Sequence, residues 1–285
     1  MPSLIDIRRR IRSVKNTQQI TKALKMISAA KLRKAQDRAL AARPYAAILQ
    51  QMLANVAQAA AQSDAGENPL LATRPENRIL LIVVTADMGK AGGFNANLIR
   101  LAQRFAEDHR SNQLSFSLVG KKGRDYFRKR GFTVRAEYID IFRVVKFETA
   151  EKIADRVIDL YTKAEIDAVY LFGNEFKSVM ASHLSARRLL PIEVPKSAET
   201  VGYIYEQPPA ELLGSLLPRY LKVKLFRALL ESAAAEHAAR MTAMEAATTN
   251  ATDMIDKLTL YMNRVRQASI TREIIEIVSG AAALE

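Results

Sequence analysis

The sequence predicts an α/β protein: a long antiparallel, left-handed coiled coil of the N- and C-terminal helices, with an inserted Rossmann-like domain. Residues 3–43 and 219–279 contain neither glycine nor proline, and both have helical apolar periodicity. Between them, short apolar runs alternate with helical patterns. We therefore expect an N-terminal coiled-coil helix over 1–62, the α/β domain over 77–206 and a C-terminal coiled-coil helix over 209–285.

The N-terminal segment is rich in good helix formers and has an amphipathic pattern. Its apolar stripe runs through Leu4, Ile7, Ile11 and Val14, and after a small shift of register through Ile20, Leu24 and Ile27. Pro44 falls inside the helical composition, which continues to Gln62. At 1.5 Å per residue such a helix spans roughly 80 Å, so part of it projects or pairs with a comparable helix.

The C-terminal segment supplies that partner, because its seam residues alternate between four- and three-residue spacing. This is the 3.5-residue repeat of a left-handed coiled coil. Small residues in the upper seam favour close approach of the two helices. The predicted seam is His237, Met241, Met244, Thr248, Ala251, Ile255, Leu258, Met262, Val265 and Ser269.

The middle of the chain alternates strands with helices, which predicts a mostly parallel, Rossmann-like sheet. We expect strands over 78–85, 114–119, 132–136 and 168–172. We expect helices over 95–109, 121–130 and 149–163. The loops that lead back to the second long helix are marked by Pro191, Pro195, Pro208 and Pro209.

Composition excludes several classes of function. There is no cysteine among the 285 residues, so disulfides, cysteine-ligated zinc and thiol catalysis are ruled out. The three histidines are far apart in sequence, which argues against a histidine metal site. No apolar run approaches the ~18–20 residues of a membrane span, and no signal peptide is evident. A cytoplasmic protein is expected, and binding to a membrane complex from outside stays open.

The net charge of +13 is concentrated at the N-terminus, where residues 1–45 hold 12 Lys/Arg and 2 Asp/Glu. The cations that include Arg8, Arg9 and Lys22 therefore lack matching acids on their own helix. An acidic surface of protein, nucleic acid or lipid is the expected partner.

Three further motifs have a structural and a functional interpretation. The predicted turn after the first strand contains Gly89, Gly92 and Gly93, and α/β folds bind phosphate at this place. These glycines match neither the GxGxxG fingerprint nor the P-loop. A tight turn or a contact loop is therefore favoured over a nucleotide site. Basic residues over 121–130 suit a nucleic-acid surface or a solvated helix with Tyr126 and Phe127 turned inward. Glu236 beside His237 lies in a predicted seam without a substrate pocket, which argues against catalysis.

Three stretches in the two terminal segments, together with one turn, carry a family resemblance. Residues 5–35 read IDIRRRIRSVKNTQQITKALKMISAAKLRKA, and residues 236–244 and 261–278 read EHAARMTAM and YMNRVRQASITREIIEIV. With Asp87 and the Gly92-Gly93-Phe94-Asn95 turn, they resemble F-type ATP synthase gamma subunits over the whole chain. The lack of a transit peptide suggests a bacterial form.

This resemblance implies a non-catalytic central rotor shaft that couples proton-driven rotation of a c-subunit ring to the catalytic sites of beta subunits. The implied partners are the alpha and beta subunits of the hexamer, the epsilon subunit and the c ring, with no nucleic acid, metal or cofactor. The implied location is peripheral, on the cytoplasmic side of the cell membrane, with membrane contact only through the complex.

The resemblance also assigns contacts to particular residues. It implies beta-subunit contacts at Arg266, Gln267 and Thr271, and it suggests c-ring or epsilon contacts at Tyr205 and Glu206. The cations Arg8, Arg9 and Lys22 are expected to meet acidic beta segments.

One position departs from the family pattern. Where the family has arginine in the loop after the first strand, this chain has Met88, and the nearest cation is Lys90. Lys90 is expected to substitute as the beta-subunit contact, although an ammonium group cannot reproduce a bidentate guanidinium contact.

Two rival functions remain open from sequence alone. The first is a nucleic-acid-binding coiled coil, which the positive charge of the N-terminal segment supports. The second is a nucleotide-dependent enzyme that uses the turn from Gly89 to Gly93.

Overall fold

The computed structural model describes residues 3–61, 68–176, 178, 182–194 and 205–282. The chain forms two units, which we call the coiled-coil unit (residues 1–28 and 241–285) and the sheet unit (residues 29–240). Two helices, α1 (Leu4–Ala60) and α5 (Pro209–Ala282), contribute residues to both units. None of the described helices is both long enough and apolar enough to span a bilayer.

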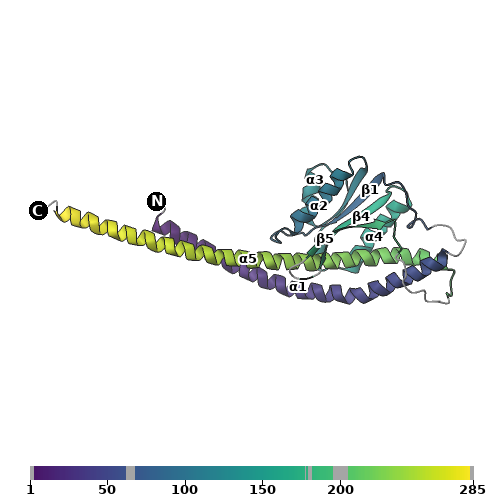
Figure 1. Ribbon diagram of the computed structural model, residues 1–285, viewed down its shortest axis with the longest axis horizontal. Coiled ribbons are helices and arrows are strands. Elements are labelled where there is room, and N and C mark those ends of the chain that lie inside the picture. Colours follow the sequence, from purple (N-terminus) through teal and green to yellow (C-terminus); the bar gives the residue numbers. More distant parts are fainter. Residues whose placement is uncertain (1–2, 62–67, 177, 179–181, 195–204, 283–285) are drawn as a thin grey trace. The chain divides into compact units, whose positions relative to one another are not determined.

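The strands described in the sheet unit form one sheet with the order β3-β2-β1-β4-β5 (Figure 1). Strand β1 pairs in parallel with β2 and β4, and β2 pairs in parallel with β3. This confirms the predicted mostly parallel, Rossmann-like sheet. The strands are β1 (Arg78–Val84), β2 (Gln113–Val119), β3 (Val134–Tyr138), β4 (Ala168–Phe176) and β5 (Ser182–Leu190).

Helices connect the parallel strands, as predicted, with ends shifted by one or two residues. They are α2 (Phe94–Asp108), α3 (Lys121–Lys129) and α4 (Phe147–Thr162), together with the short 3₁₀ helix η1 (Ile141–Arg143). In Figure 1, α2 and α3 lie on one side of the sheet, and α4 lies on the other.

Strand β5 was not predicted from the sequence. It pairs antiparallel with β4 at the edge of the sheet. Its exposed or half-buried positions include His183, Arg187 and Arg188, so it has no continuous apolar run. Backbone pairing with β4 stabilises this strand. Its sequence shows no clear strand pattern because an edge strand needs no apolar outer face.

The strand period of two divides the core between the two faces of the sheet. On β1, Ile79, Leu81 and Val83 pack with α2 and α3. The alternate residues Leu80, Ile82 and Val84 join the cluster that contains α4 and the sheet-unit parts of α1 and α5. Both faces are therefore covered, which is why β1 appears in the sequence as an uninterrupted apolar run.

The sheet-unit parts of α1 and α5 share this second cluster, which contains Leu49 and Leu53 of α1 and Leu217 and Leu221 of α5. Pro44 lies within α1 and does not end it. The predicted continuation of the helix past this proline is confirmed. Residue 62, the predicted end of the first segment, lies outside the described residues.

The coiled-coil unit is antiparallel, as three side-chain pairs demonstrate. The Gln18 amide donates to the Thr252 hydroxyl over 2.7 Å, and the Thr21 and Thr248 hydroxyls are 2.8 Å apart. The Lys25 ammonium is 2.5 Å from the Glu245 carboxylate. Residue numbers rise along α1 as they fall along α5, which confirms the predicted antiparallel pairing.

The predicted seam of α5 is confirmed by burial. Met244 and Ala251 are buried, and the other predicted seam positions of this unit are half-buried. The half-buried positions are Met241, Thr248, Ile255, Leu258, Met262, Val265 and Ser269. The 3.5-residue repeat therefore identifies the face of α5 that packs within this unit.

The predicted register shift on α1 is wrong. Ile20 and Ile27 are 57% and 52% exposed, and Leu24 is only half-buried. The repeat instead continues unshifted from Val14 through less exposed polar residues, namely Gln18, Thr21, Lys25 and Ser28. The apolar pattern gave the wrong register because Gln18, Thr21 and Lys25 occupy seam positions and pair with polar groups of α5. The Ser28 hydroxyl donates to the Leu24 carbonyl of its own helix.

Candidate interaction surfaces

The loop that follows β1 begins with a close approach of two chain segments. The Thr85 hydroxyl donates to the Val119 carbonyl over 2.9 Å and accepts the Gly123 N–H over 2.8 Å. Gly120 has φ +89°, and a Cβ there would lie 2.1 Å from the Thr85 carbonyl oxygen. Only glycine fits this position, so the start of the loop is fixed against the start of α3.

Asp87 fixes the next part of the loop. Its Oδ1 accepts the backbone N–H groups of Lys121 and Asp140, each over 3.1 Å. On the other side, the Asn95 side-chain oxygen accepts the Ala86 N–H over 2.9 Å. One oxygen of the Asp87 carboxylate therefore holds the loop in place.

Met88 and Lys90 are the exposed side chains of this loop. Met88 is 63% exposed, and Lys90 is also exposed with a left-handed φ of 62°. Lys90 makes no ion pair within the part of the chain that the structure describes. The loop thus presents one apolar and one cationic side chain, and the predicted beta contact of Lys90 stays a prediction.

The glycine turn packs as a structural element. Gly92 has φ 55°, and Gly93 immediately precedes α2. Ala91 and Phe94 are buried with Ala235 of α5. These contacts favour the tight-turn interpretation of the glycines.

A buried ion pair lies against the same loop. Arg240 Nη2 is 2.5 Å from Glu236 Oε1 and 3.4 Å from the Gly89 carbonyl oxygen. The two side chains are only 9% and 5% exposed. Within the described residues, the second Glu236 oxygen and Arg240 Nε have no hydrogen-bond partner. The i,i+4 spacing in sequence suggests the pair, but nothing in the sequence indicates its contact with Gly89.

Burial dominates the protonation of this cluster. It raises the pKa of Glu236, against the lowering influence of Arg240. It lowers the pKa of His237 to about 4, and the positive charges of Arg240 and Lys31 act in the same direction. His237 is therefore neutral near pH 7, with its Nδ1 3.4 Å from Arg240 Nη1.

The basic stretch of α3 is largely committed to partners within the sheet unit. Lys121 lies 2.8 Å from Asp140, and Arg124 lies 2.7 Å from Asp125. Phe127 is fully buried, and the half-buried Tyr126 donates to Gln103 over 2.6 Å. The inward orientation of Phe127 is confirmed, and the paired charges favour a structural role over a nucleic-acid surface.

The predicted cations of α1 are exposed. Among the described residues of the coiled-coil unit, the one ion pair within 4.0 Å is Lys25–Glu245, so Arg8 and Lys22 have no bound acid. Arg9 contributes to lowering the pKa of Asp6, after the hydrogen bonds from Ser3. Their side chains are free to meet an external acidic surface.

Arg266, Gln267 and Thr271 are exposed on α5, and the Thr271 hydroxyl donates to the Gln267 carbonyl over 2.9 Å. Extending the observed pairing toward the N-terminus places Leu4 level with about Val265. The structure thus brings Arg266 close to the beginning of α1. Beyond it, exposed apolar residues follow, at Ile270, Ile274, Ile275, Ile277 and Val278.

The predicted c-ring or epsilon contacts belong to the sheet unit, as does Lys90. Tyr205 is half-buried and packs against the core cluster, whereas Glu206 is exposed. Within the described residues, no group of three or more acidic or histidine side chains could hold a metal ion.

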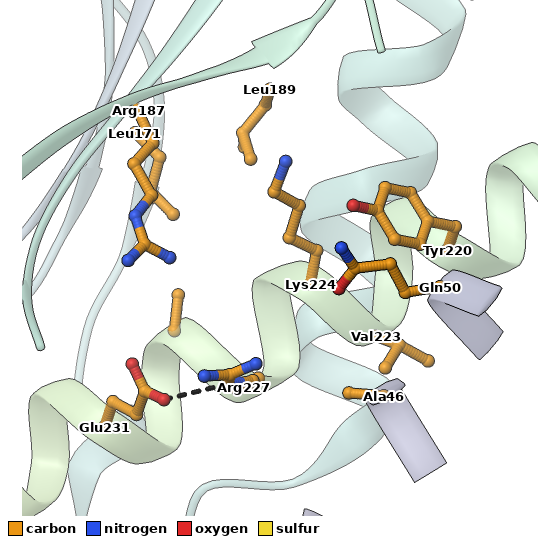
Figure 2. A pocket seen from close by; sticks show the side chains of 11 residues that line it. Ala46, Gln50, Leu171, Arg187, Leu189, Tyr220, Val223, Lys224, Arg227 and Glu231 are labelled. Carbon is orange, nitrogen blue, oxygen red and sulfur yellow. Dashed lines mark hydrogen bonds and ion pairs between the residues drawn. The ribbon is translucent and has the colours of Figure 1, made fainter. Parts of the chain in front are cut away.

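A cavity of about 250 Å³ lies within the sheet unit and was not predicted from sequence. Its walls come from α1, β4, β5 and α5 (Figure 2). Its cationic residues are spread over sequence positions 187–227, so no local sequence motif predicts that they line one cavity.

Comparison with known proteins identifies relatives that match the chain from end to end. A family model described as ATP synthase matches residues 3–284. The chain is 63% identical over 286 residues to the "ATP synthase gamma chain" of Solibacter usitatus, covering 100% of both chains. It is 50% identical to the protein of the same name from Pelotomaculum thermopropionicum, again over 100% of both.

Solved structures give the same picture. A central stalk/c-ring structure of the Tetrahymena thermophila mitochondrial ATP synthase matches with TM-score 0.64 and 27% identity, covering 80% of this chain and 99% of that one. A rotor structure of the Euglena gracilis enzyme matches with TM-score 0.66 and 20% identity, covering 94% and 98%, and so supports the fold alone.

Proposed function

The chain belongs to the family of ATP synthase gamma chains, and from this premise we propose that it is the central rotor shaft of an F-type ATP synthase. In this role it couples proton-driven rotation of the c ring to conformational changes at the catalytic sites of the beta subunits. The observation that carries the proposal is the antiparallel coiled-coil unit, whose seam is paired through Gln18–Thr252, Thr21–Thr248 and Lys25–Glu245.

The proposed mechanism uses shape and charge, with the chemistry performed by other subunits. A coiled coil of two unlike helices is asymmetric, so it presents a different face to each beta subunit around it. A face that contacts one beta conformation better than another shifts the population toward that conformation, as any ligand does. Rotation of the shaft then changes which subunit is favoured.

Specific contacts follow from the exposed side chains. We assign beta-subunit contacts to Arg266, Gln267 and Thr271, and ionic contacts with acidic beta segments to Arg8, Arg9 and Lys22. The cations among them, Arg8, Arg9, Lys22 and Arg266, form no ion pair within 4.0 Å in the described part of the coiled-coil unit. The exposed apolar residues between Ile270 and Val278 suit an apolar sleeve, in which non-directional contacts hinder rotation little.

In the sheet unit, Lys90 takes the place of the family arginine as a weaker, single-point contact with a beta subunit. Tyr205 and Glu206 are assigned to the c ring or the epsilon subunit. The chain thereby attaches to the cytoplasmic side of the cell membrane through the complex.

The test is single-molecule rotation in a reconstituted complex, with a bead attached to the sheet unit. We expect truncation of both helices of the coiled-coil unit to short stubs to abolish most of the torque. Full torque from the truncated shaft would contradict the proposal. A milder variant, Arg266→Gln, is expected to reduce torque or ATP turnover relative to its neighbour Arg264→Gln, another exposed arginine of the same helix.

The rival nucleic-acid function has a separate test. Titration of the isolated chain with random duplex DNA is expected to show only weak binding. Tight binding with a steep dependence on salt would favour the rival instead.

A further inference from the structure

The cavity of the sheet unit has an unusual charge arrangement. Figure 2 shows the side chains of Lys224 and Arg187 extending into the space beside Leu189, with Tyr220 on the opposite side of Lys224. Arg227 and Glu231 lie on the same helix as Lys224, below this space in the view. Three cations and one carboxylate therefore line it.

Two of these cations are already compensated. Arg187 forms an ion pair with Glu175 of β4, and Arg227 Nε is 2.8 Å from Glu231. Lys224 differs, since among the described residues no carboxylate lies within 4.0 Å of its ammonium group, which lies 5.4 Å from the centre of the Tyr220 ring. One positive charge in the cavity is left without a partner.

The surroundings of Lys224 make that charge costly. Burial lowers the pKa of Lys224, the positive charge of Arg187 lowers it further, and Glu193 opposes both. Glu193 is itself bonded to Arg188 at 2.6 Å. A partly desolvated ammonium group is stabilised most effectively by an anion with hydrogen-bond acceptors.

The size of the cavity limits what that anion can be. A volume of about 250 Å³ exceeds the ~30 Å³ share of one water molecule several-fold. It falls below the ~300–1,000 Å³ typical of sites for drug-sized ligands. A small oxyanion with a few waters matches this volume better than a whole nucleotide does.

We propose that this cavity is a binding site for a small oxyanion of the phosphate class, held by Lys224 and Arg187, with the Tyr220 hydroxyl as a further donor. The hydroxyl donates to no acceptor among the described residues, which leaves it available. Because Arg187 belongs to β5 and Lys224 to α5, a bound anion bridges the sheet and the long helix within the sheet unit. The inference is independent of the proposed rotor function.

The test measures thermal unfolding of the full chain in inorganic phosphate against chloride at equal ionic strength. Phosphate is expected to raise the melting temperature saturably, beyond the effect of chloride, since it binds the folded state. Lys224→Met keeps the apolar stem and is expected to weaken the apparent affinity by about tenfold. Lys152→Met, which removes an exposed charge from α4, is expected to respond as the wild type does. Equal responses of the Lys224→Met and wild-type chains, or no saturable response of the wild type, would overturn the site.

Two further measurements keep the proposal open to refutation if Lys224→Met fails to fold. Tyr220→Phe retains the packing of the ring and is expected to weaken phosphate binding by about threefold. Reductive methylation followed by mass spectrometry is expected to show that phosphate slows the modification of Lys224 but not of Lys152. Phosphate protection of both lysines alike, or of neither, contradicts the site. Equal or stronger protection of Lys224 by ATP contradicts the assignment to a small ion.

Discussion

Arg240 and Glu236 form an ion pair that is almost completely removed from solvent, beneath the loop that carries Lys90. Arg240→Met leaves the Glu236 carboxylate buried without its cation. We expect the free energy of unfolding to fall by about 3–5 kcal/mol, because removing one partner of a buried ion pair leaves the other charge buried and uncompensated. Urea denaturation of the variant and wild-type chains measures this difference.

The matched control for this variant is the exposed pair of the coiled-coil unit, in which Lys25 and Glu245 are 37% and 56% exposed. Lys25→Met is expected to cost less than about 1 kcal/mol, since solvent screens both charges. Similar losses from the two variants would mean that the Arg240–Glu236 pair contributes no more than a surface contact.

His237, beside the same pair, gives a pH-dependent prediction. Its pKa is about 4 in the folded chain, against 6.5 for an unperturbed imidazole. Between these values the unfolded chain binds more protons, so this residue makes stability fall as pH falls from 6.5 toward 4. The raised pKa of Glu236 acts in the opposite sense, since the folded state then holds a proton more readily.

The contribution of His237 is isolated by comparison with His237→Gln. We expect the stability of the wild type relative to this variant to decrease by up to about 3 kcal/mol as the pH is lowered through that window. Urea unfolding at a series of pH values measures it, and His183→Gln on the exposed face of β5 is the control. Parallel pH profiles for wild type and His237→Gln would contradict the burial of a neutral imidazole.

At the level of elements, the sequence predicts those whose pattern reflects burial on a regular period. The run at Ile79–Val83 predicts β1 because both of its faces are covered, and the 3.5-residue repeat from Met241 predicts the seam of α5. Strand β5 was not predicted because backbone pairing with β4, and not an apolar pattern of its own, stabilises it. Predicted contact residues such as Lys90 are found exposed, but a surface residue carries no signal of what it binds.

The corrected seam of α1 leads to a direct comparison of isoleucines on one helix. Ile7 is 4% exposed in the seam, whereas Ile20 is 57% exposed outside it. We expect Ile7→Ala to lower the stability of the coiled-coil unit by about 2 kcal/mol, from lost burial and a cavity. Ile20→Ala is expected to change it by less than about 0.5 kcal/mol.

Thermal melting followed by far-ultraviolet circular dichroism compares these two variants, because loss of the coiled coil removes helical signal. A larger effect at Ile20 than at Ile7 would restore the shifted register that the apolar pattern suggested. It would also show that the polar residues Gln18 and Thr21 do not occupy the seam.

Across the whole molecule, burial is distributed unevenly between the two units. In the described part of the coiled-coil unit, the buried side chains are only those of Ile7, Thr21, Ser28, Met244 and Ala251. The sheet unit has two apolar clusters that cover both faces of β1. Since apolar burial is the main source of stability, the two units should differ in how readily they open.

Hydrogen exchange on the isolated chain tests this difference. We expect the amides of α1 and α5 in the coiled-coil unit to exchange at least about tenfold faster than those of β1, which corresponds to about 1.4 kcal/mol less opening free energy. A seam of threonine, glutamine and lysine buries little apolar surface by itself. This is consistent with a segment that gains further stabilising contacts from an enclosing assembly. Adding the subunits that surround the shaft should therefore slow exchange mainly in residues 4–28 and 241–282. Uniform protection of both units in the isolated chain would show that the polar seam is sufficient for stability and that no enclosing partner is needed to hold it together.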